Sequence, residues 1–359
     1  MVRHTSGPSL TLVTDPDTAE CTPEVMSVAD DEIVVFRGAE RQVWSDLAPD
    51  TEVDLGGYVV RTLPRRGERL AEIATVNDVH FGETVAGHVD GVPEWPTFSV
   101  GEGEPPYPET MNAAAVEEIA AIDPDAVVAK GDLTSEGTLA EYERFVEVYG
   151  GAFGDRLLHV RGNHESYHRL PVATWPTQER SLPGVIVAVL DTSADGEING
   201  HLDAEQLEWL DELGSRADRP VLVFGHHPVW NPAEEPRHDH TFGIVPDGTE
   251  GLARVMARRD ALVGYFAGHT HRNRVVHLPG AGEIPFAEVA SVKDYPGSWA
   301  EYRVFEGSIL QIHRRISRPD ALAWTERTRG MFGGAYPEYS RGHLAERCFE
   351  IAVPARLVS

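Results

Sequence analysis

The stretch that decides the fold is DAVVAKGDLTSEG (125–137), and three further stretches repeat its form along the chain. These are RLLHVRGNHESYH (156–168), PVLVFGHHPVW (220–230) and ALVGYFAGHTHRN (261–273). In each stretch a short apolar run, typical of a buried strand, is followed by a glycine beside Asp, Asn or His. Because ligands of open α/β sheets bind beyond the carboxyl ends of the strands, we expect these polar side chains to line a binding site there.

The segments between these runs predict an alternation of strands and helices. A strand is expected at residues 73–76, and the spacing of apolar residues predicts helices at 109–122, 138–150 and 203–213. The C-terminal third of the chain is rich in β-like runs. Strand–helix alternation followed by β-like runs predicts a layered α/β domain with mixed sheets.

The chain is expected to divide into three parts. Residues 1–69 form an N-terminal extension, which is β-rich after a loose tail. Residues 70–318 form the main domain, and residues 319–359 form a C-terminal extension packing on it. Within that extension, MFGGAYPEY (331–339) either folds over the active face or covers a sheet edge.

Charge and cysteine content limit the class of protein. The formal net charge of −27 disfavours binding to nucleic acid or to an anionic membrane, and a solvated or salt-tolerant surface accounts for it without a basic partner. Cys21 and Cys348 lie far apart and in no metal-type spacing, which fits a reducing compartment. The N-terminus lacks the apolar core of a signal peptide and no stretch is apolar enough to span a bilayer, so we expect a cytoplasmic protein.

The polar blocks together offer a set of metal-type ligands. A fifth block follows EIATVN (72–77) and completes the set: Asp78, His80, Asp132, Asn163, His226, His269 and His271. Imidazole suits Zn, Fe, Ni and Cu, whereas carboxylate and amide oxygens suit harder ions such as Mn. Seven ligands are too many for one ordinary site and fit two ions about 3.5–4 Å apart. Asp132, which is short and has two oxygens, is the candidate bridge between them.

The local spacing suggests how the ligands are directed. Residues two apart in extended chain face the same way, so Asp78 with His80, and His269 with His271, can each reach one centre. Glycines beside the ligands lack Cβ and permit sharp turns; these are Gly131, Gly162, Gly225 and Gly268.

The order Asp-x-His, Gly-Asp, Gly-Asn-His-Glu, Gly-His, Gly-His-x-His, over roughly residues 72–315, resembles the calcineurin-like metallophosphoesterase superfamily. GDLTSEGTLAEYERF (131–145), LDTSADGEINGHLDAEQLEWLDE (190–212) and GHHPVW are most similar to its class III cyclic-nucleotide phosphodiesterase and glycerophosphodiesterase group. The protein serine/threonine phosphatase branch is disfavoured because its second block differs, and the purple acid phosphatase branch because Ser135 stands where it has a tyrosine ligand. The DNA-repair nuclease branch fits poorly with the acidic charge.

The resemblance implies a four-layer α/β/β/α sandwich with mixed sheets and a dinuclear centre of divalent or mixed-valence ions, Mn, Fe or Zn. One ion would be held by Asp78, His80, Asp132 and His271. The other would be held by Asp132, Asn163, His226 and His269. His164 would be the catalytic histidine that faces the substrate, and Glu165 would orient it.

The resemblance further implies hydrolysis of a small phosphodiester, of the cyclic-nucleotide or glycerophosphodiester type, by attack of a metal-bridging hydroxide. Two alternatives stay open: a phosphomonoesterase or nucleotidase with the same centre, and a metal-binding relic without turnover. The partner is a small phosphorylated substrate rather than nucleic acid or membrane, and a homo-oligomer stays open.

Several residues beyond the ligand set are candidates for the substrate pocket. They are Tyr167, His168, Arg169, His227, His238 and His240. The expectation for His227 is a pocket role rather than metal ligation. Segments 84–108 and 231–248, which lack periodicity and flank the motifs, are candidate rims or lids. Tyr295 and Trp299 are either core residues or substrate stackers.

Overall fold

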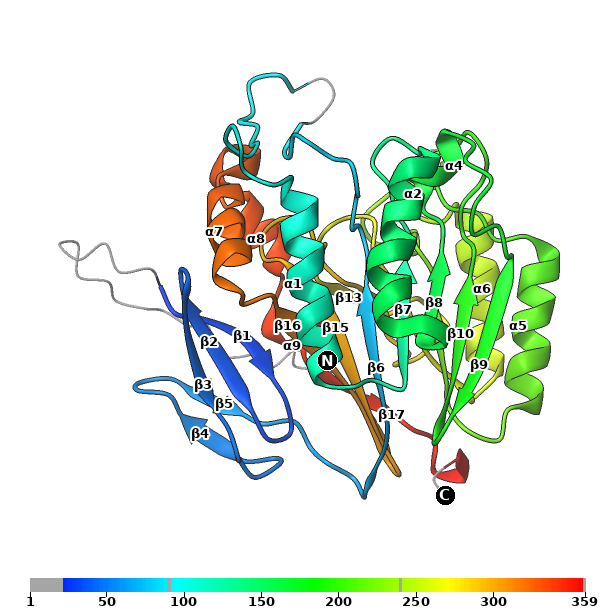
Figure 1. Cartoon of the computed structure of the whole chain (residues 1–359). Helices are drawn as coiled ribbons and strands as arrows, with labels where there is room; N and C mark the ends of the chain where they lie inside the picture. The colour runs from blue at the N-terminus through cyan, green and yellow to red at the C-terminus, as the bar shows by residue number, and fades with distance from the viewer. Residues whose placement is uncertain (1–21, 89–91, 239–240, 358–359) are drawn as a thin grey trace.

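The computed structural model describes residues 22–88, 92–238 and 241–357 and has two six-stranded sheets at its centre (Figure 1). The first sheet has the order β17-β16-β15-β6-β7-β8. Its strands are β6 (Arg69–Val76), β7 (Ala126–Lys130), β8 (Leu157–Val160), β15 (Ser298–Phe305), β16 (Ser308–Arg315) and β17 (Phe349–Ala352). Strands β6, β7 and β8 run parallel, whereas β15, β16 and β17 pair antiparallel with their neighbours.

The second sheet has the order β13-β14-β12-β11-β10-β9. Its strands are β9 (Thr177–Leu182), β10 (Val185–Leu190), β11 (Val221–Phe224), β12 (Leu262–Ala267), β13 (Arg274–Val276) and β14 (Phe286–Glu288). Strands β10, β11, β12 and β14 are parallel, and the two edge strands are antiparallel. The two sheets confirm the predicted α/β class with mixed sheets.

Apolar residues of the two sheets face each other. Phe224 and Phe266 of the second sheet pack against Tyr302 of the first, with ring centroids 5.5 and 5.1 Å apart. A second apolar cluster joins the first sheet to helices α1 (Tyr107–Ala121) and α7 (Pro319–Thr328). A third joins the second sheet to helices α5 (Ala204–Arg216) and α6 (Pro246–Arg258). Because both faces of each sheet are covered, the strands read as nearly continuous apolar runs.

The helices follow the periodic segments closely. They are α1 (Tyr107–Ala121), α2 (Leu139–Phe145), α3 (Gly151–Phe153), α4 (Asn163–Tyr167), α5 (Ala204–Arg216), α6 (Pro246–Arg258), α7 (Pro319–Thr328), α8 (Tyr336–Arg341) and α9 (Leu344–Arg347). The helices expected at 109–122 and 203–213 are confirmed as α1 and α5. The one expected at 138–150 is α2 followed by a π-helical stretch, Val146–Gly150. None of the helices in the described ranges is long and apolar enough to cross a membrane.

The N-terminal part forms two small antiparallel sheets beside the first large sheet (Figure 1). Their strands are β1 (Glu24–Val28), β2 (Ile33–Arg37), β3 (Glu40–Trp44), β4 (Glu52–Asp54) and β5 (Val59–Arg61). His313 Nδ1 of β16 lies 3.1 Å from the Met26 carbonyl, and Arg303 of β15 binds Asp30 at 2.6 Å. The boundaries drawn at residues 69 and 318 stay predictions.

The C-terminal part returns to the large sheets after α7. Helices α8 and α9 precede β17, which pairs with β16 as the edge strand of the first sheet. Helix α6 begins at Pro246, inside the segment 231–248 that showed no periodicity in the sequence. Cys348 is a buried free thiol, and Cys21 lies outside the described residues.

Candidate metal centre

The seven predicted ligands lie on five loops that leave the carboxyl ends of strands. The first large sheet contributes the loops after β6, β7 and β8, and the second contributes those after β11 and β12. Ligand-type atoms of Asp78, His80 and His271 lie within 4.8 Å of one another, as do those of Asp78, Asp132 and His226. The folded chain therefore gathers the predicted set at the place that the strand ends define.

Left-handed backbone conformations direct most of these side chains. Five predicted ligands have a positive φ: Asp78 (52°), His80 (45°), Asp132 (49°), His269 (71°) and His271 (56°). Such conformations cost energy for residues other than glycine and persist where the surroundings impose them, often at functional sites. The expectation that Asp78 and His80 share a direction because the chain is extended is therefore wrong, and so is the same expectation for His269 and His271. Tight turns aim these pairs instead.

Two glycines show different reasons for lacking a side chain. Gly131, just before Asp132, has a φ of 89° and makes the sharp turn that the sequence predicts. Gly162 has no positive φ, but a Cβ there would lie 2.2 Å from Asp132 Oδ1. At Gly162 the requirement is therefore room for the Asp132 carboxylate rather than freedom of the backbone.

Asp132 lies at the centre of the site. Its Oδ1 is 3.3 Å from His226 Nε2, and its Oδ2 is 3.5 Å from His80 Nε2 and 3.9 Å from His164 Nε2. Burial alone would raise the pKa of Asp132, but the facing imidazoles of His226 and His164 hold it well below its ordinary value. A buried, ionised carboxylate that presents one oxygen to each side is suited to bridge two cations.

Asp78 organises the neighbouring side of the site. Its Oδ1 lies 3.4 Å from His271 Nε2, and its Oδ2 accepts the backbone N–H of His269 at 3.0 Å. The amide of Asn77 donates to the same Oδ2 at 2.5 Å and to the Val289 carbonyl at 3.0 Å. These contacts fix the direction of the Asp78 carboxylate before any ligand binds.

Buried nitrogen atoms without partners show that the donor set fits metal ions. Within the described ranges, both ring nitrogens of His80 and Nε2 of His269 have no hydrogen-bond partner. Burial lowers the pKa of His80 to about 4 and that of His269 to about 3, so both rings are neutral near pH 7. Unsatisfied buried nitrogens are costly, and the neutral imidazole is the form that ligates a cation. Divalent ions therefore match these residues chemically.

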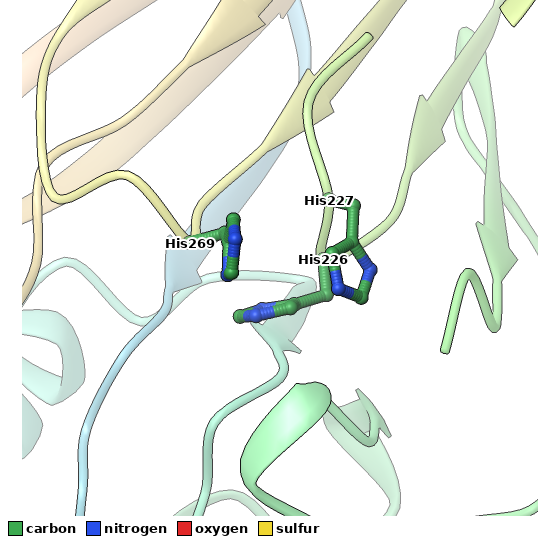
Figure 2. A group of neighbouring side chains, drawn as sticks. All are labelled: His226, His227 and His269. Carbon is green, nitrogen blue, oxygen red and sulfur yellow. The ribbon is translucent and has the colours of Figure 1, made fainter. Parts of the chain in front are cut away.

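Three imidazoles gather at the ends of β11 and β12 (Figure 2): His226, His227 and His269. His226 Nε2 lies 3.0 Å from Asn163 Oδ1. His227 differs, because its Nε2 donates to the Ile198 carbonyl at 3.1 Å and its Nδ1 accepts from Thr192 Oγ1 at 2.8 Å. With both nitrogens engaged by protein groups, His227 supports the loop at residue 198 and has no lone pair to offer a metal ion.

His164 lies at the rim of the site with one nitrogen anchored. Its Nδ1 donates to the Ser135 carbonyl at 2.6 Å, and its imidazole packs on that of His80 with centroids 4.5 Å apart. The expected orienting partner, Glu165, instead accepts the backbone N–H groups of Thr134 and Gly162 at 2.7 and 2.6 Å. Ser135, rather than Glu165, therefore makes the contact that orients the ring of His164.

The candidate pocket residues divide into three groups. Tyr167 is half-buried and lies against the ring of His164 at 5.1 Å. His168, Arg169 and His238 are exposed, and His240 lies outside the described residues. Tyr295 and Trp299 are buried, 0% and 3% exposed, which confirms the core alternative and excludes the substrate-stacking one.

Two residues that the sequence did not single out lie at the site. Asp294 is fully buried, and its Oδ2 is 3.5 Å from His271 Nδ1. Phe242 is 65% exposed, and its ring lies 5.6 Å from that of His269. Neither stands in a recognisable motif, although a large exposed aromatic between the buried residues Thr241 and Gly243 is an unusual local pattern.

Comparison of the sequence with known proteins identifies the family to which the chain belongs. The sequence profile of the calcineurin-like phosphoesterases matches residues 71–273. A probable glycerophosphodiester phosphodiesterase from Arcobacter nitrofigilis is 29% identical over 246 residues, which are 62% of this chain and 85% of that protein. A cAMP/cGMP dual specificity phosphodiesterase from Mycobacterium tuberculosis is 33% identical over 117 residues, 29% of this chain and 37% of that protein.

A solved structure supports the fold. A dimetal phosphatase from Danio rerio superimposes with a TM-score of 0.53 at 16% sequence identity, covering 69% of this chain and 98% of that one. At this identity the likeness concerns the fold alone. Together with the sequence comparisons, it agrees with the resemblance that the polar blocks indicated.

Proposed function

The chain belongs to the calcineurin-like phosphoesterase family and is a metal-dependent phosphoric ester hydrolase, and from that premise we propose that it hydrolyses a small phosphodiester at a dinuclear metal centre. The family uses such a centre, and the relatives named above act on glycerophosphodiesters or on cyclic nucleotides. The observation that carries the proposal is the gathering of Asp78, Asp132 and the site imidazoles at one place, where among the described residues both ring nitrogens of His80 and Nε2 of His269 have no hydrogen-bond partner.

The proposed ligand assignment is that of the family resemblance, and the grouping of Asp78, His80 and His271 supports its first half. These three residues would hold one ion, and Asn163, His226 and His269 would hold the other, with Asp132 shared. When bound, two such ions supply Lewis acidity, which activates water as the nucleophile and offsets negative charge on the phosphoryl oxygens. The chain's contribution is to hold these donors on loops clamped between two sheets, so that little reorganisation accompanies the reaction.

We assign His164 as the general acid. Because Nδ1 donates its hydrogen to the Ser135 carbonyl, Nε2 is the nitrogen that points toward Asp132. When Nε2 carries a proton, it can pass that proton to the ester oxygen as the P–O bond breaks, and the leaving group departs as an alcohol. The side chain is 25% exposed, which leaves it within reach of a bound substrate.

The test is a comparison of two chromogenic substrates on protein reconstituted with Mn, Zn or Fe in turn. Faster hydrolysis of bis(p-nitrophenyl) phosphate than of p-nitrophenyl phosphate would support the proposal. Cyclic nucleotides and glycerophosphodiesters would then be compared. Faster cleavage of the monoester would replace the proposal with a phosphatase or nucleotidase. A protein that binds no metal would contradict the enzyme mechanism altogether.

The remaining expectations stay proposals. The small phosphorylated substrate rests on the family and its relatives, and the charge of −27 disfavours nucleic acid. A cytoplasmic location and the oligomeric state rest on the sequence alone.

A further inference from the structure

We propose that the C-terminal segment 336–342 is a component of the metal centre: it fixes the carboxylate of Asp294, and Asp294 orients His271. Both Asp294 and the segment lie outside residues 71–273, the part that matches the family. The proposal rests on the metal centre proposed above and is independent of the identity of the substrate.

The Asp294 carboxylate is held from two sides. Its Oδ1 accepts hydrogen bonds from Ser291 Oγ and from Tyr336 Oη, both at 2.6 Å. Its Oδ2 has no conventional hydrogen-bond partner among the described residues and lies 3.5 Å from His271 Nδ1 and 3.8 Å from Lys293 Nζ. Two donors on one oxygen therefore turn the other oxygen toward the imidazole.

This arrangement determines which nitrogen of His271 is available. A carboxylate beside Nδ1 favours the tautomer in which Nδ1 carries the hydrogen. Nε2, which lies 3.4 Å from Asp78 Oδ1, then presents its lone pair on the side of the proposed ligands. Carboxylates that accept a hydrogen bond from a metal-binding histidine fix its ring orientation and raise its basicity. Asp294 is thus a positioning residue, because it acts through His271.

The segment that carries Tyr336 also binds the loop that carries His271, at two points. Tyr339 Oη donates to the Thr270 carbonyl at 2.8 Å, between two proposed ligands. The Ser340 carbonyl accepts both the backbone N–H and the side-chain amide of Asn273, at 2.9 and 3.1 Å. Gly342 follows with a φ of 65°, where a Cβ would lie 2.1 Å from the Asn273 carbonyl. Such close docking leaves the 270–273 loop little freedom to move away from helix α8.

The segment is itself anchored to the N-terminal sheet. Arg341 Nη1 binds Glu24 Oε1 at 2.7 Å, and Arg329 Nη2 binds Glu24 Oε2 at 2.5 Å. Glu24 is 8% exposed, and it is the first residue of β1. Because the Glu24 carboxylate is buried, loss of its arginine partners would leave a buried charge without compensation, which is strongly destabilising. Both extensions therefore contribute to holding the Tyr336 hydroxyl in place.

The variant Asp294→Asn isolates this role. An aspartate offers two acceptor oxygens, and this site uses Oδ1 for two donors and Oδ2 for the imidazole. An asparagine has one oxygen, so it can face either Tyr336 and Ser291 or His271, but not both. The substitution keeps size and shape. It removes either the acceptor that faces His271 or the contacts that aim it, together with the negative charge beside Lys293.

The experiment measures metal affinity directly. Metal-free full-length protein is titrated with Mn²⁺ alone by calorimetry and by electron paramagnetic resonance of the free ion, which together give two stepwise dissociation constants. We expect Asp294→Asn to weaken one step about 10- to 100-fold and to leave the other within a few-fold. Tyr336→Phe should weaken the same step about 5-fold, which corresponds to one lost hydrogen bond. In the Asp294→Asn background, Tyr336→Phe should add little.

A matched control separates positioning from general destabilisation. Tyr302→Phe removes another fully buried tyrosine hydroxyl, which donates to Gln311 Oε1 at 3.1 Å within the first sheet. It should lower the melting temperature without changing either dissociation constant. Saturating Mn²⁺ should restore activity to Tyr336→Phe if its defect lies in metal binding.

The outcomes are distinguishable. Unchanged metal affinity in folded Asp294→Asn and Tyr336→Phe would overturn the inference while leaving the proposed function standing. Equal weakening by Tyr302→Phe would also overturn it. A wild-type protein that binds two ions and shows the Asp294 effect, but cleaves no diester, would support the inference and contradict the proposed function.

Discussion

Replacement of His164 by alanine gives a quantitative test of the proposed acid catalysis. His164 Nε2 lies 3.9 Å from Asp132 Oδ2, and Nδ1 donates its hydrogen to the Ser135 carbonyl, so Nδ1 has no lone pair for a metal ion. Because His164 is proposed as an acid rather than a ligand, His164→Ala should keep both metal ions. General acid catalysis contributes about 10²–10⁴-fold, or roughly 3–5 kcal/mol of the barrier.

The size of the loss should depend on the leaving group. An alkoxide needs a proton as the P–O bond breaks, so a glycerophosphodiester should lose the full factor in kcat. The p-nitrophenolate anion is stable without a proton, so bis(p-nitrophenyl) phosphate should lose about tenfold or less. The assay is steady-state kinetics on both substrates, with metal content measured on the same samples.

His277→Ala is the matched control for this experiment. His277 is an exposed histidine in the turn after β13, and its Nδ1 also faces a backbone carbonyl, that of Ile284 at 3.2 Å. Its removal should leave both rates unchanged. An equal loss on the alkyl and aryl substrates would refute proton donation by His164. Loss of an ion from His164→Ala would show that it is a ligand and would refute the assignment.

Three further predictions concern the bridge, the rim and the fold. Asp132→Asn should abolish binding of at least one ion and reduce kcat by more than about 10³-fold, as measured by metal analysis and kinetics; two tightly bound ions would contradict its bridging role. Phe242→Ala should lower kcat/KM for bis(p-nitrophenyl) phosphate about 2- to 12-fold relative to ethyl p-nitrophenyl phosphate. The exposed Phe242 ring lies beside His269, where it can stack on the second aromatic group of the diester. An unchanged ratio of the two kcat/KM values would exclude that contact. Burial and the adjacent Glu301 raise the pKa of Glu72 to about 8, so the folded state binds this proton more tightly than the unfolded state. The stabilisation is complete below about pH 4.5 and is lost as the pH rises through 8. Melting temperatures should therefore fall over that window, and Glu72→Gln should flatten the decline; an identical slope in the variant would disprove the coupling.

The gathering of the proposed ligands at strand ends could be predicted because each of them stands just after a strand. Short apolar runs specify buried strands, and parallel strands in one sheet deliver their carboxyl ends to the same edge. Sheet formation alone brings Asp78, Asp132 and Asn163 to one edge, whereas their meeting with His226, His269 and His271 also depends on the packing of the two sheets. The direction of the paired ligands was predicted wrongly, because left-handed turns at Asp78 and His80 depend on neighbouring loops.

The site residues that the sequence analysis missed owe their role to contacts with a distant part of the chain. Asp294 follows no strand in a ligand-type block, and its relation to His271 arises only when Tyr336 comes back beside it. Such contacts join segments far apart in sequence, and local periodicity carries no signal for them. Helix α6 was missed for a different reason, since its start at Pro246 lies within a segment rich in Gly, Pro and Asp.

The division of the proposed ligands between two sheets has a mechanical consequence. Those on loops of the first sheet are Asp78, His80, Asp132 and Asn163, and those on loops of the second are His226, His269 and His271. An ion that binds donors from both sheets would cross-link the loops of one sheet to those of the other. At a concentration one hundred times its dissociation constant, such a ligand adds about 2.7 kcal/mol to the free energy of unfolding. Bound metal would thus protect the folded chain from proteases as well as support turnover. Removal of the ions by a chelator should make the protein more susceptible to proteolysis.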